Sequence, residues 1–360
     1  MSSRAEMWHI LAAAPIPQSP SPVYGKGIEP QRGSIPRPQG RGRVRDGSNI
    51  GQSLTLPIPS GWAPSLSRTR AREICVRQRR WKAGVRFSMK ASRIPCLAVL
   101  ALALAAAPPA SAEPVEIPEP GGVVLKAELF RPSGPPAAPA IVALHGCGGP
   151  YPKRDRQWTA ALGEAGHIML FPDSFASHGL GPQCRVRDRI AGYRELRRQD
   201  ALTAAAWLAA EKATPAGGVV LMGWSDGGGT VLAAGIIAAD LPAGLLRGLV
   251  AFYPACERAV KNGAWNFAAP LLILSGANDD WDAVGPCREL AAHAGPALEL
   301  VSYPGAYHDF DVDEPVHVLK NVAFSQNADG SVHVGGDPAA RADALQRVPA
   351  FIVRLPPAAP

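Results

Sequence analysis

The order of apolar segments after residue 112 is the feature that most constrains the fold of this 360-residue chain. Short apolar runs alternate with longer amphipathic stretches, a pattern typical of βαβ units and a mostly parallel sheet. Buried strands are expected at residues 140–144, 167–171, 218–222, 249–253, 271–274 and 298–303, after an edge strand at 122–130. Helices are expected at residues 155–165, 186–210, 228–239, 284–293 and 339–353.

No internal repeat or second change of composition interrupts residues 113–360, and their length suits one large α/β domain. Only about a dozen residues separate Cys256 from the strand expected at 271–274, so no large cap is inserted there. The sequence therefore predicts the α/β class, with a single doubly wound, mostly parallel sheet flanked by helices and no large cap.

The basic side chains are concentrated at the N-terminal end of the chain. Residues 1–112 hold 17 of the 37 Lys and Arg residues but only 4 of the 30 Asp and Glu residues. Residues 113–360 therefore carry 20 basic and 26 acidic side chains, although the whole chain has a net charge of +7. Because an acidic domain is repelled by a phosphate backbone, nucleic-acid binding is not expected.

Residues 89–112 contain the three parts of a secretory signal peptide in the required order. Lys90 and Arg93 form the charged segment, and residues 97–107 form the apolar segment. Small residues at 110–112 then supply a cleavage sequence. This order predicts export of the chain.

The apolar run is too short for a permanent membrane anchor, because its 11 residues cover about half of a bilayer core. Cys96 precedes this run, which argues against a lipidated cysteine at the cleavage site. We expect cleavage near Ala112 and a periplasmic or secreted protein. Residues 1–88 are rich in Arg, Pro, Gly and Ser without periodicity, so Met89 is the expected true start, and a natural disordered extension is the alternative.

A G-x-S-x-G sequence at 223–227 lies between an expected strand and an expected helix. In that context a sharp strand-to-helix turn exposes the serine hydroxyl above the sheet, and the flanking glycines avoid collisions within the turn. Such a turn is called a nucleophile elbow, and Ser225 is therefore the expected nucleophile.

A serine nucleophile needs a general base that a carboxylate orients. His308 follows the strand expected at 298–303, and Asp279 follows the strand expected at 271–274. Both positions lie at the same edge of a parallel sheet as Ser225, where ligand sites in such sheets form. His308 is the expected base and Asp279 the expected acid. Asp280 is the alternative acid, because a one-residue shift of the loop would exchange the two.

The Gly-rich loop at 145–149 follows the strand expected at 140–144. Glycines let its backbone approach a substrate, so the N–H groups of Cys147 and Asp226 are expected to form the oxyanion hole. A phosphate-binding loop is not expected, because no Lys-Ser or Lys-Thr pair follows the glycines.

Residues from about 121 to 355 resemble the dienelactone hydrolase family of α/β-hydrolases. The motifs that carry the resemblance are HGCGG at 145–149, PDSF at 172–175, GWSDGG at 223–228, SGANDDW at 275–281 and YPGAYHDF at 303–310. The resemblance implies an α/β-hydrolase fold, with Ser225 as nucleophile, Asp279 as acid and His308 as base.

Two positions depart from enzymes that open dienelactones. Those enzymes carry a cysteine at the elbow and a glutamate in the loop after the first central strand. Here these places hold Ser225 and the glycine loop at 146–149. Ester hydrolysis remains the expected chemistry, whereas dienelactone as the substrate does not follow.

Four cysteines lie after residue 112, an even number that suits an oxidising compartment. All four follow strand ends on the presumed active-site side, so disulfides are expected between Cys147 and Cys184 and between Cys256 and Cys287. No His and Cys set has zinc-finger spacing, so neither a metal nor another cofactor is expected.

The sequence thus predicts an exported serine hydrolase that cleaves a small-molecule ester or lactone through an acyl-enzyme. A thioesterase, a polymer esterase and a catalytically silent binding protein on the same fold are the alternatives. Trp224, Trp281 and Phe175 are expected to line the substrate pocket. The oligomeric state does not follow from the sequence.

Overall fold

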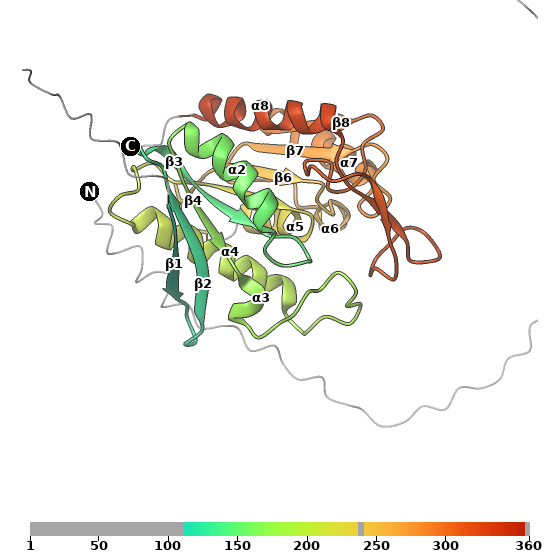
Figure 1. The fold of residues 1–360 in the computed structure, drawn as a ribbon, viewed down its shortest axis with the longest axis horizontal. Helices are drawn as coiled ribbons and strands as arrows, with labels where there is room; N and C mark the ends of the chain where they lie inside the picture. Colours follow the sequence, from blue (N-terminus) through green and yellow to red (C-terminus); the bar gives the residue numbers. More distant parts are fainter. Residues whose placement is uncertain (1–110, 237–240, 357–360) are drawn as a thin grey trace, which may run out of the picture. The chain divides into compact units, whose positions relative to one another are not determined.

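The computed structural model describes residues 111–236 and 241–356, which form an α/β domain (Figure 1). Its strands are β1 (Ser111–Pro118), β2 (Val124–Arg131), β3 (Ala137–Leu144), β4 (His167–Pro172), β5 (Val219–Trp224), β6 (Leu246–Phe252), β7 (Leu271–Gly276), β8 (Leu298–Tyr303), β9 (His317–Leu319) and β10 (Val332–Val334). Its helices are α2 (Pro152–Glu164), α3 (Ser174–Ser177), α4 (Tyr193–Ala210), α5 (Asp226–Gly235), α6 (Glu257–Lys261), α7 (Val284–Ala294) and α8 (Pro338–Arg354), with a short 3₁₀ turn, η1 (Gly295–Ala297).

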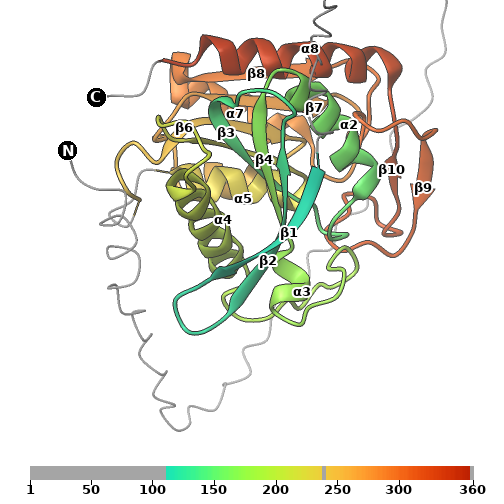
Figure 2. The same ribbon diagram turned by 60° about the vertical axis from the view of Figure 1, so that its left-hand side comes forward.

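Eight strands form one sheet in the order β1-β2-β4-β3-β5-β6-β7-β8. The strands from β4 across to β8 run parallel to one another, whereas β1 and β2, at one end of the sheet, are antiparallel to their neighbours (Figure 2). The predicted class is therefore confirmed: the sheet is mostly parallel and is flanked by helices.

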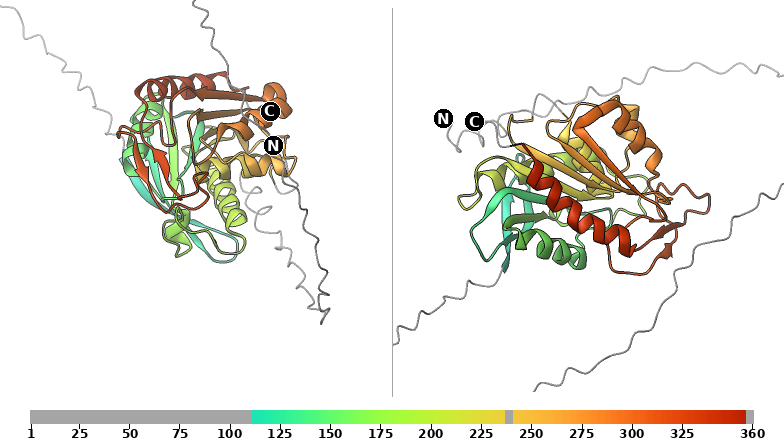
Figure 3. Two further views of the ribbon diagram at one scale, coloured as in Figure 1. Left: turned by 90° about the vertical axis from the view of Figure 1, so that its right-hand side faces the viewer. Right: turned by 90° about the horizontal axis from the view of Figure 1, so that it is seen from above.

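The two faces of the sheet are covered by different helices (Figure 3). Alternate residues of a strand point to opposite faces, so Ile141 and Val142 of β3 belong to two different apolar cores. One core includes apolar side chains of α4, α5 and α7, and the other includes those of α2 and α8. Burial on both faces explains why the central strands read as continuous apolar runs.

The N-terminal end of the sheet differs from the prediction. The strand expected at the edge, residues 122–130, is β2, and it lies between β1 and β4. The actual edge strand is β1, which carries Pro114 and Pro118. Because prolines are strong signals against a central strand and are tolerated at an edge, β1 had a weak strand signal. The predicted signal peptide and residues 1–88 lie outside the described residues, except for Ser111 and Ala112, which begin β1.

Helix α4 begins at Tyr193, seven residues after the predicted start at Val186. Gly192, at the N-cap, has a φ of 75°, a left-handed conformation that glycine adopts without strain. The residues before it form a loop that contains Cys184, and the N–H of Gln183 donates to the Cys147 carbonyl at 2.7 Å. This loop therefore pairs with the Gly-rich loop that follows β3.

The structure contains the two expected disulfides, Cys147–Cys184 and Cys256–Cys287. The second joins the N-cap of α6 to α7, across 31 residues of sequence. Of the helices in residues 111–236 and 241–356, none is both long and apolar enough to cross a membrane.

Replacing both Cys256 and Cys287 with alanine is expected to lower the free energy of unfolding by about 3–4 kcal/mol, because a disulfide closing a loop of this length restricts the unfolded chain. Urea unfolding under oxidising conditions measures the difference. Under reducing conditions the variant and the wild-type protein should unfold at nearly the same urea concentration. Equal stability under oxidising conditions would show that this cross-link does not stabilise the fold.

Candidate active site

Ser225 occupies a strained turn between β5 and α5. Its φ of 54° and ψ of −116° lie in a region that residues with a side chain rarely adopt. The turn is possible because its neighbours are glycines: a Cβ on Gly223 would lie 2.5 Å from the carbonyl oxygen of Gly227. A Cβ on Gly227 would collide with the carbonyl oxygen of Leu144 in β3. The G-x-S-x-G pattern thus follows from steric constraints at this turn.

His308 and Asp279 lie in loops that follow β8 and β7, and they form a buried pair. The Nδ1 atom of His308 is 2.8 Å from Oδ2 of Asp279. The other oxygen of Asp279, Oδ1, accepts the backbone N–H groups of Trp281 and Asp282, each at 2.9 Å. These bonds fix the carboxylate, and the carboxylate in turn fixes the imidazole.

The alternative acid, Asp280, is directed elsewhere. Its Oδ2 lies 2.8 Å from Nδ1 of His333, and its Oδ1 accepts the backbone N–H of His333 at 2.9 Å. The side chain of Asn327 donates to the same carboxylate at 2.9 Å. Asp280 therefore holds the segment that contains β10, and Asp279 is the residue paired with His308.

The environment of His308 favours its protonated form. Burial alone would lower the pKa of His308, but the Asp279 carboxylate, with Asp309 and Asp282 nearby, raises it to about 9. The Nε2 atom is buried and has no hydrogen-bond partner among the described residues. Ser225 and His308 share no hydrogen bond in this part of the chain, so the structure joins the acid to the base but not the base to the serine.

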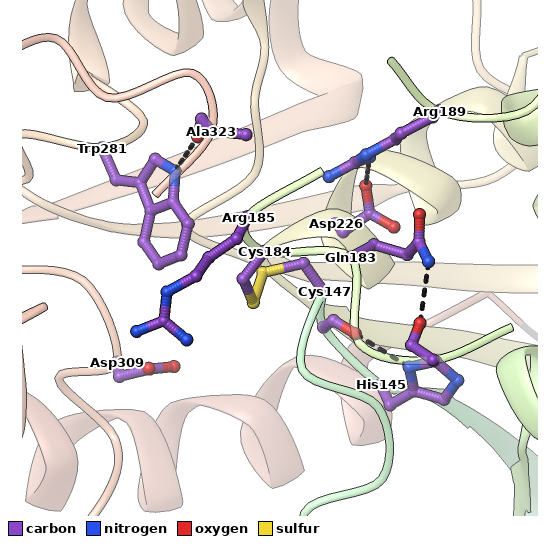
Figure 4. The surroundings of a disulfide bond; sticks show 12 residues. His145, Cys147, Gln183, Cys184, Arg185, Arg189, Asp226, Trp281, Asp309 and Ala323 are labelled. Atoms are coloured by element: carbon purple, nitrogen blue, oxygen red, sulfur yellow. Dashed lines mark hydrogen bonds and ion pairs between the residues drawn. A yellow bond between two sulfur atoms is a disulfide. The ribbon is translucent and has the colours of Figure 1, made fainter. Parts of the chain in front are cut away.

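A cavity of about 450 Å³ opens beside Ser225. Its wall includes Cys147, Asp226, Trp281 and the exposed side chain of Phe324. The indole nitrogen of Trp281 donates to the carbonyl of Ala323 at 3.0 Å, which holds this wall together (Figure 4).

Two of the three aromatic residues predicted for this pocket lie elsewhere, and this corrects the sequence analysis. Trp224 is fully buried in the core on the α2 and α8 face, because the register of β5 turns its last side chain to that side. Phe175 is buried against the ring of His145, with 4.5 Å between ring centroids. Only Trp281 lines the cavity.

The two expected oxyanion donors belong to residues on the cavity wall, Cys147 and Asp226. Asp226 is the first residue of α5, and the first four N–H groups of a helix have no partner inside it. The Gly-rich loop comes close to the elbow, since a Cβ on Gly146 would lie 3.5 Å from the Cβ of Ser225. The role of these two N–H groups as oxyanion donors stays a prediction.

A buried arginine that the sequence analysis missed ties these two loops together. Arg197 of α4 is 2% exposed and donates to the carbonyl oxygen of His145 at 2.6 Å. Its Nε lies 3.7 Å from the Asp226 carboxylate, which also accepts a hydrogen bond from the Tyr193 hydroxyl at 2.6 Å. Arg189 donates to the same carboxylate at 2.7 Å (Figure 4). Tyr193 and Arg197 are four residues apart, so the helical spacing places them on one face of α4.

The surroundings of His145 and Asp226 determine which of the two side chains is charged. Burial and the Arg197 guanidinium lower the pKa of His145 to about 3, so its ring is neutral. A neutral ring can donate from Nδ1 to the Gly146 carbonyl at 2.8 Å and accept from Arg197 at Nε2, at 3.0 Å. Burial would raise the pKa of Asp226, but Arg197 and Arg189 lower it. Asp226 is therefore an anion at the start of α5, directly after Ser225.

A second buried network, also missed, holds the loop after His308. Asp311 is fully buried and accepts three hydrogen bonds: from the indoles of Trp158 at 2.8 Å and Trp224 at 2.9 Å, and from the Tyr253 hydroxyl at 2.6 Å. Arg154 donates to the Tyr253 hydroxyl at 3.0 Å. The network anchors the loop three residues beyond the candidate base.

Replacing Asp311 with alanine is expected to lower the free energy of unfolding by about 3–5 kcal/mol, because three buried donors would lose their acceptor. Asp311→Asn keeps one acceptor oxygen and should lose less. Chemical unfolding measures both, with Asp313→Ala as the matched control because that side chain is 74% exposed. An Asp311→Ala protein as stable as this control would contradict the assigned role of the network.

Comparison with known proteins identifies a family that the chain matches and solved structures of similar fold. The model of the dienelactone hydrolase family matches residues 125–355. The dienelactone hydrolase of Anabaena variabilis superimposes with a TM-score of 0.50 and 20% identity, over 69% of this chain and 99% of that one. A promiscuous dienelactone hydrolase-like phosphotriesterase from metagenomic libraries superimposes with a TM-score of 0.54 and 17% identity, over 68% of this chain and 98% of that one. At these identities the two structures support the fold alone. A search of curated proteins found no match.

Proposed function

The chain belongs to the dienelactone hydrolase family and is a hydrolase of the α/β fold, and from that premise we propose that it cleaves carboxylic esters or lactones. Ser225 is the proposed nucleophile, His308 the general base and Asp279 the residue that orients the base. The backbone N–H groups of Cys147 and Asp226 are the proposed oxyanion donors.

The observation that carries this proposal is the buried pair of His308 and Asp279. Asp279 holds Nδ1 of the imidazole at 2.8 Å, and Nε2 is buried without a partner among the residues described. A buried nitrogen of this kind needs a hydrogen-bond partner, and a serine hydroxyl supplies one. Ser225 stands at the same edge of the sheet, and hydrogen bonds between catalytic groups often tighten only when substrate binds.

In the proposed reaction, the Ser225 oxygen attacks the substrate carbonyl while Nε2 of His308 takes the hydroxyl proton. The carbonyl oxygen becomes an oxyanion that the two backbone N–H groups stabilise. Collapse of this intermediate breaks the ester bond, and His308 gives the proton to the leaving alcohol. Water then attacks the acyl-enzyme by the same route and restores Ser225.

The two disulfides are compatible with an oxidising compartment, and they support the proposal that the protein acts after export.

A phosphonate probe and short p-nitrophenyl esters distinguish an enzyme from a catalytically silent binding protein, because only an activated serine reacts with either.

Wild-type protein is expected to be labelled by a fluorophosphonate probe at Ser225, and Ser225→Ala is expected to remain unlabelled. Ester hydrolysis should fall by at least about 10³-fold in the variant, since the oxyanion donors retain only a residual rate. Peptide mapping of the labelled protein locates the adduct. Ser174→Ala, which changes another buried serine, is the control and should keep both properties. An inert wild-type protein would favour the binding role.

The rate should depend on pH through His308. The base must be neutral to take a proton, and a pKa of about 9 leaves it protonated at neutral pH. The kcat/KM value for a neutral ester is therefore expected to rise about tenfold per pH unit and to level off above pH 9.

Asp279→Asn should move this rise to lower pH, because the carboxylate no longer favours the imidazolium, and should lower the plateau by about 10⁴-fold. Asp280→Asn is the matched control and should keep the wild-type profile. A wild-type profile that is flat between pH 6 and 9 would contradict the raised pKa of His308.

A further inference from the structure

A second cluster of titratable side chains lies apart from the cavity beside Ser225. Glu119 follows β1, His178 follows α3, and Asp200 belongs to α4. Their side chains are 4%, 14% and 1% exposed. One nitrogen or oxygen of each residue lies within 4.8 Å of the others. None of the three lines the cavity beside Ser225.

The hydrogen bonds within this cluster do not satisfy its polar atoms. Nε2 of His178 lies 2.9 Å from Oδ1 of Asp200 and 3.8 Å from Oε2 of Glu119. The remaining oxygens, Oε1 of Glu119 and Oδ2 of Asp200, are buried and have no hydrogen-bond partner in the described part of the chain. Buried carboxylate oxygens of this kind are costly unless a proton, a donor or a cation satisfies them.

The spacing of these atoms suits a transition metal. A tetrahedral zinc ion with bonds of about 2.0–2.2 Å keeps its ligand atoms about 3.3–3.6 Å apart, and the two distances from His178, 2.9 Å and 3.8 Å, lie on either side of that range. An imidazole nitrogen suits zinc, whereas magnesium and calcium prefer sites made only of oxygen.

We propose that Glu119, His178 and Asp200 bind one zinc ion. No metal is expected from the sequence, because no set of His and Cys residues has zinc-finger spacing. These three ligands come from segments that are 59 and 22 residues apart in the chain.

The ion would connect the end of the edge strand to two helices. Among the described strands, β1 pairs with β2 alone, and Glu119 follows it directly. A metal that links Glu119 to α4 would hold this end of the sheet against the domain. Since an ion that binds the folded state alone stabilises it by mass action, zinc should raise the melting temperature.

The competing explanation is a proton shared by the two carboxylates, which needs no metal. Isothermal titration of the chelator-treated full-length protein with zinc chloride distinguishes the two. We expect one saturable equivalent of zinc and a rise in melting temperature that magnesium chloride does not produce. No saturable binding by the wild-type protein would overturn the site and favour the shared proton.

The variants His178→Gln and Asp200→Asn should lose this equivalent. The matched control is His333→Gln, because His333 also pairs with an aspartate but has no third ligand nearby among the described residues, and it should bind zinc as the wild type does. Binding that persists in both ligand variants would overturn the proposal.

Far-UV circular dichroism tests whether the two ligand variants fold. If neither variant folds, the visible absorption spectrum of the wild-type protein with cobalt(II) tests the site. A four-coordinate spectrum at one equivalent supports the site, and the spectrum of hydrated cobalt overturns it.

Discussion

The parallel pairing of the central strands is the constraint on which the candidate active site depends. Parallel strands end at the same edge of a sheet, so the loops after β3, β5, β7 and β8 lie together although they are far apart in the chain. Each of these loops supplies one part of the site: the Gly-rich loop, Ser225, Asp279 and His308. The strand pairing brings the loops near one another, and side-chain contacts then set their positions.

Those contacts are made by buried charges. Arg197 joins the carbonyl of His145 to the carboxylate of Asp226, and so relates the Gly-rich loop to the first turn of α5. Asp311 holds the loop after His308 through two indoles and a phenol. A buried ion or carboxylate is costly to leave unsatisfied, so each network favours a single arrangement of its loop.

Sequence patterns were sufficient for the parallel strands from β3 to β8 and for the position of three polar residues in the loops that follow them. Long apolar runs predict buried strands. Ser225 follows β5 directly, and Asp279 and His308 lie three and five residues beyond the ends of β7 and β8. The choice between Asp279 and Asp280 needed His333, which is 53 residues from Asp280 and lies in a three-residue strand without a strong pattern. Arg197 was missed because its partners come from two other segments. Trp224 was misplaced because its orientation depends on the register of β5.

The edge strand β1 has a consequence for how copies of this protein meet. An unpaired strand edge can add a strand from another molecule and so begin aggregation. Pro114 and Pro118 are four residues apart, so their nitrogens lie on one side of β1, and a proline nitrogen carries no hydrogen to donate. Two donors are thus missing from the side that a foreign strand would use. The prolines that weakened the strand signal therefore also make the β1 edge a poorer template for a strand of a second copy.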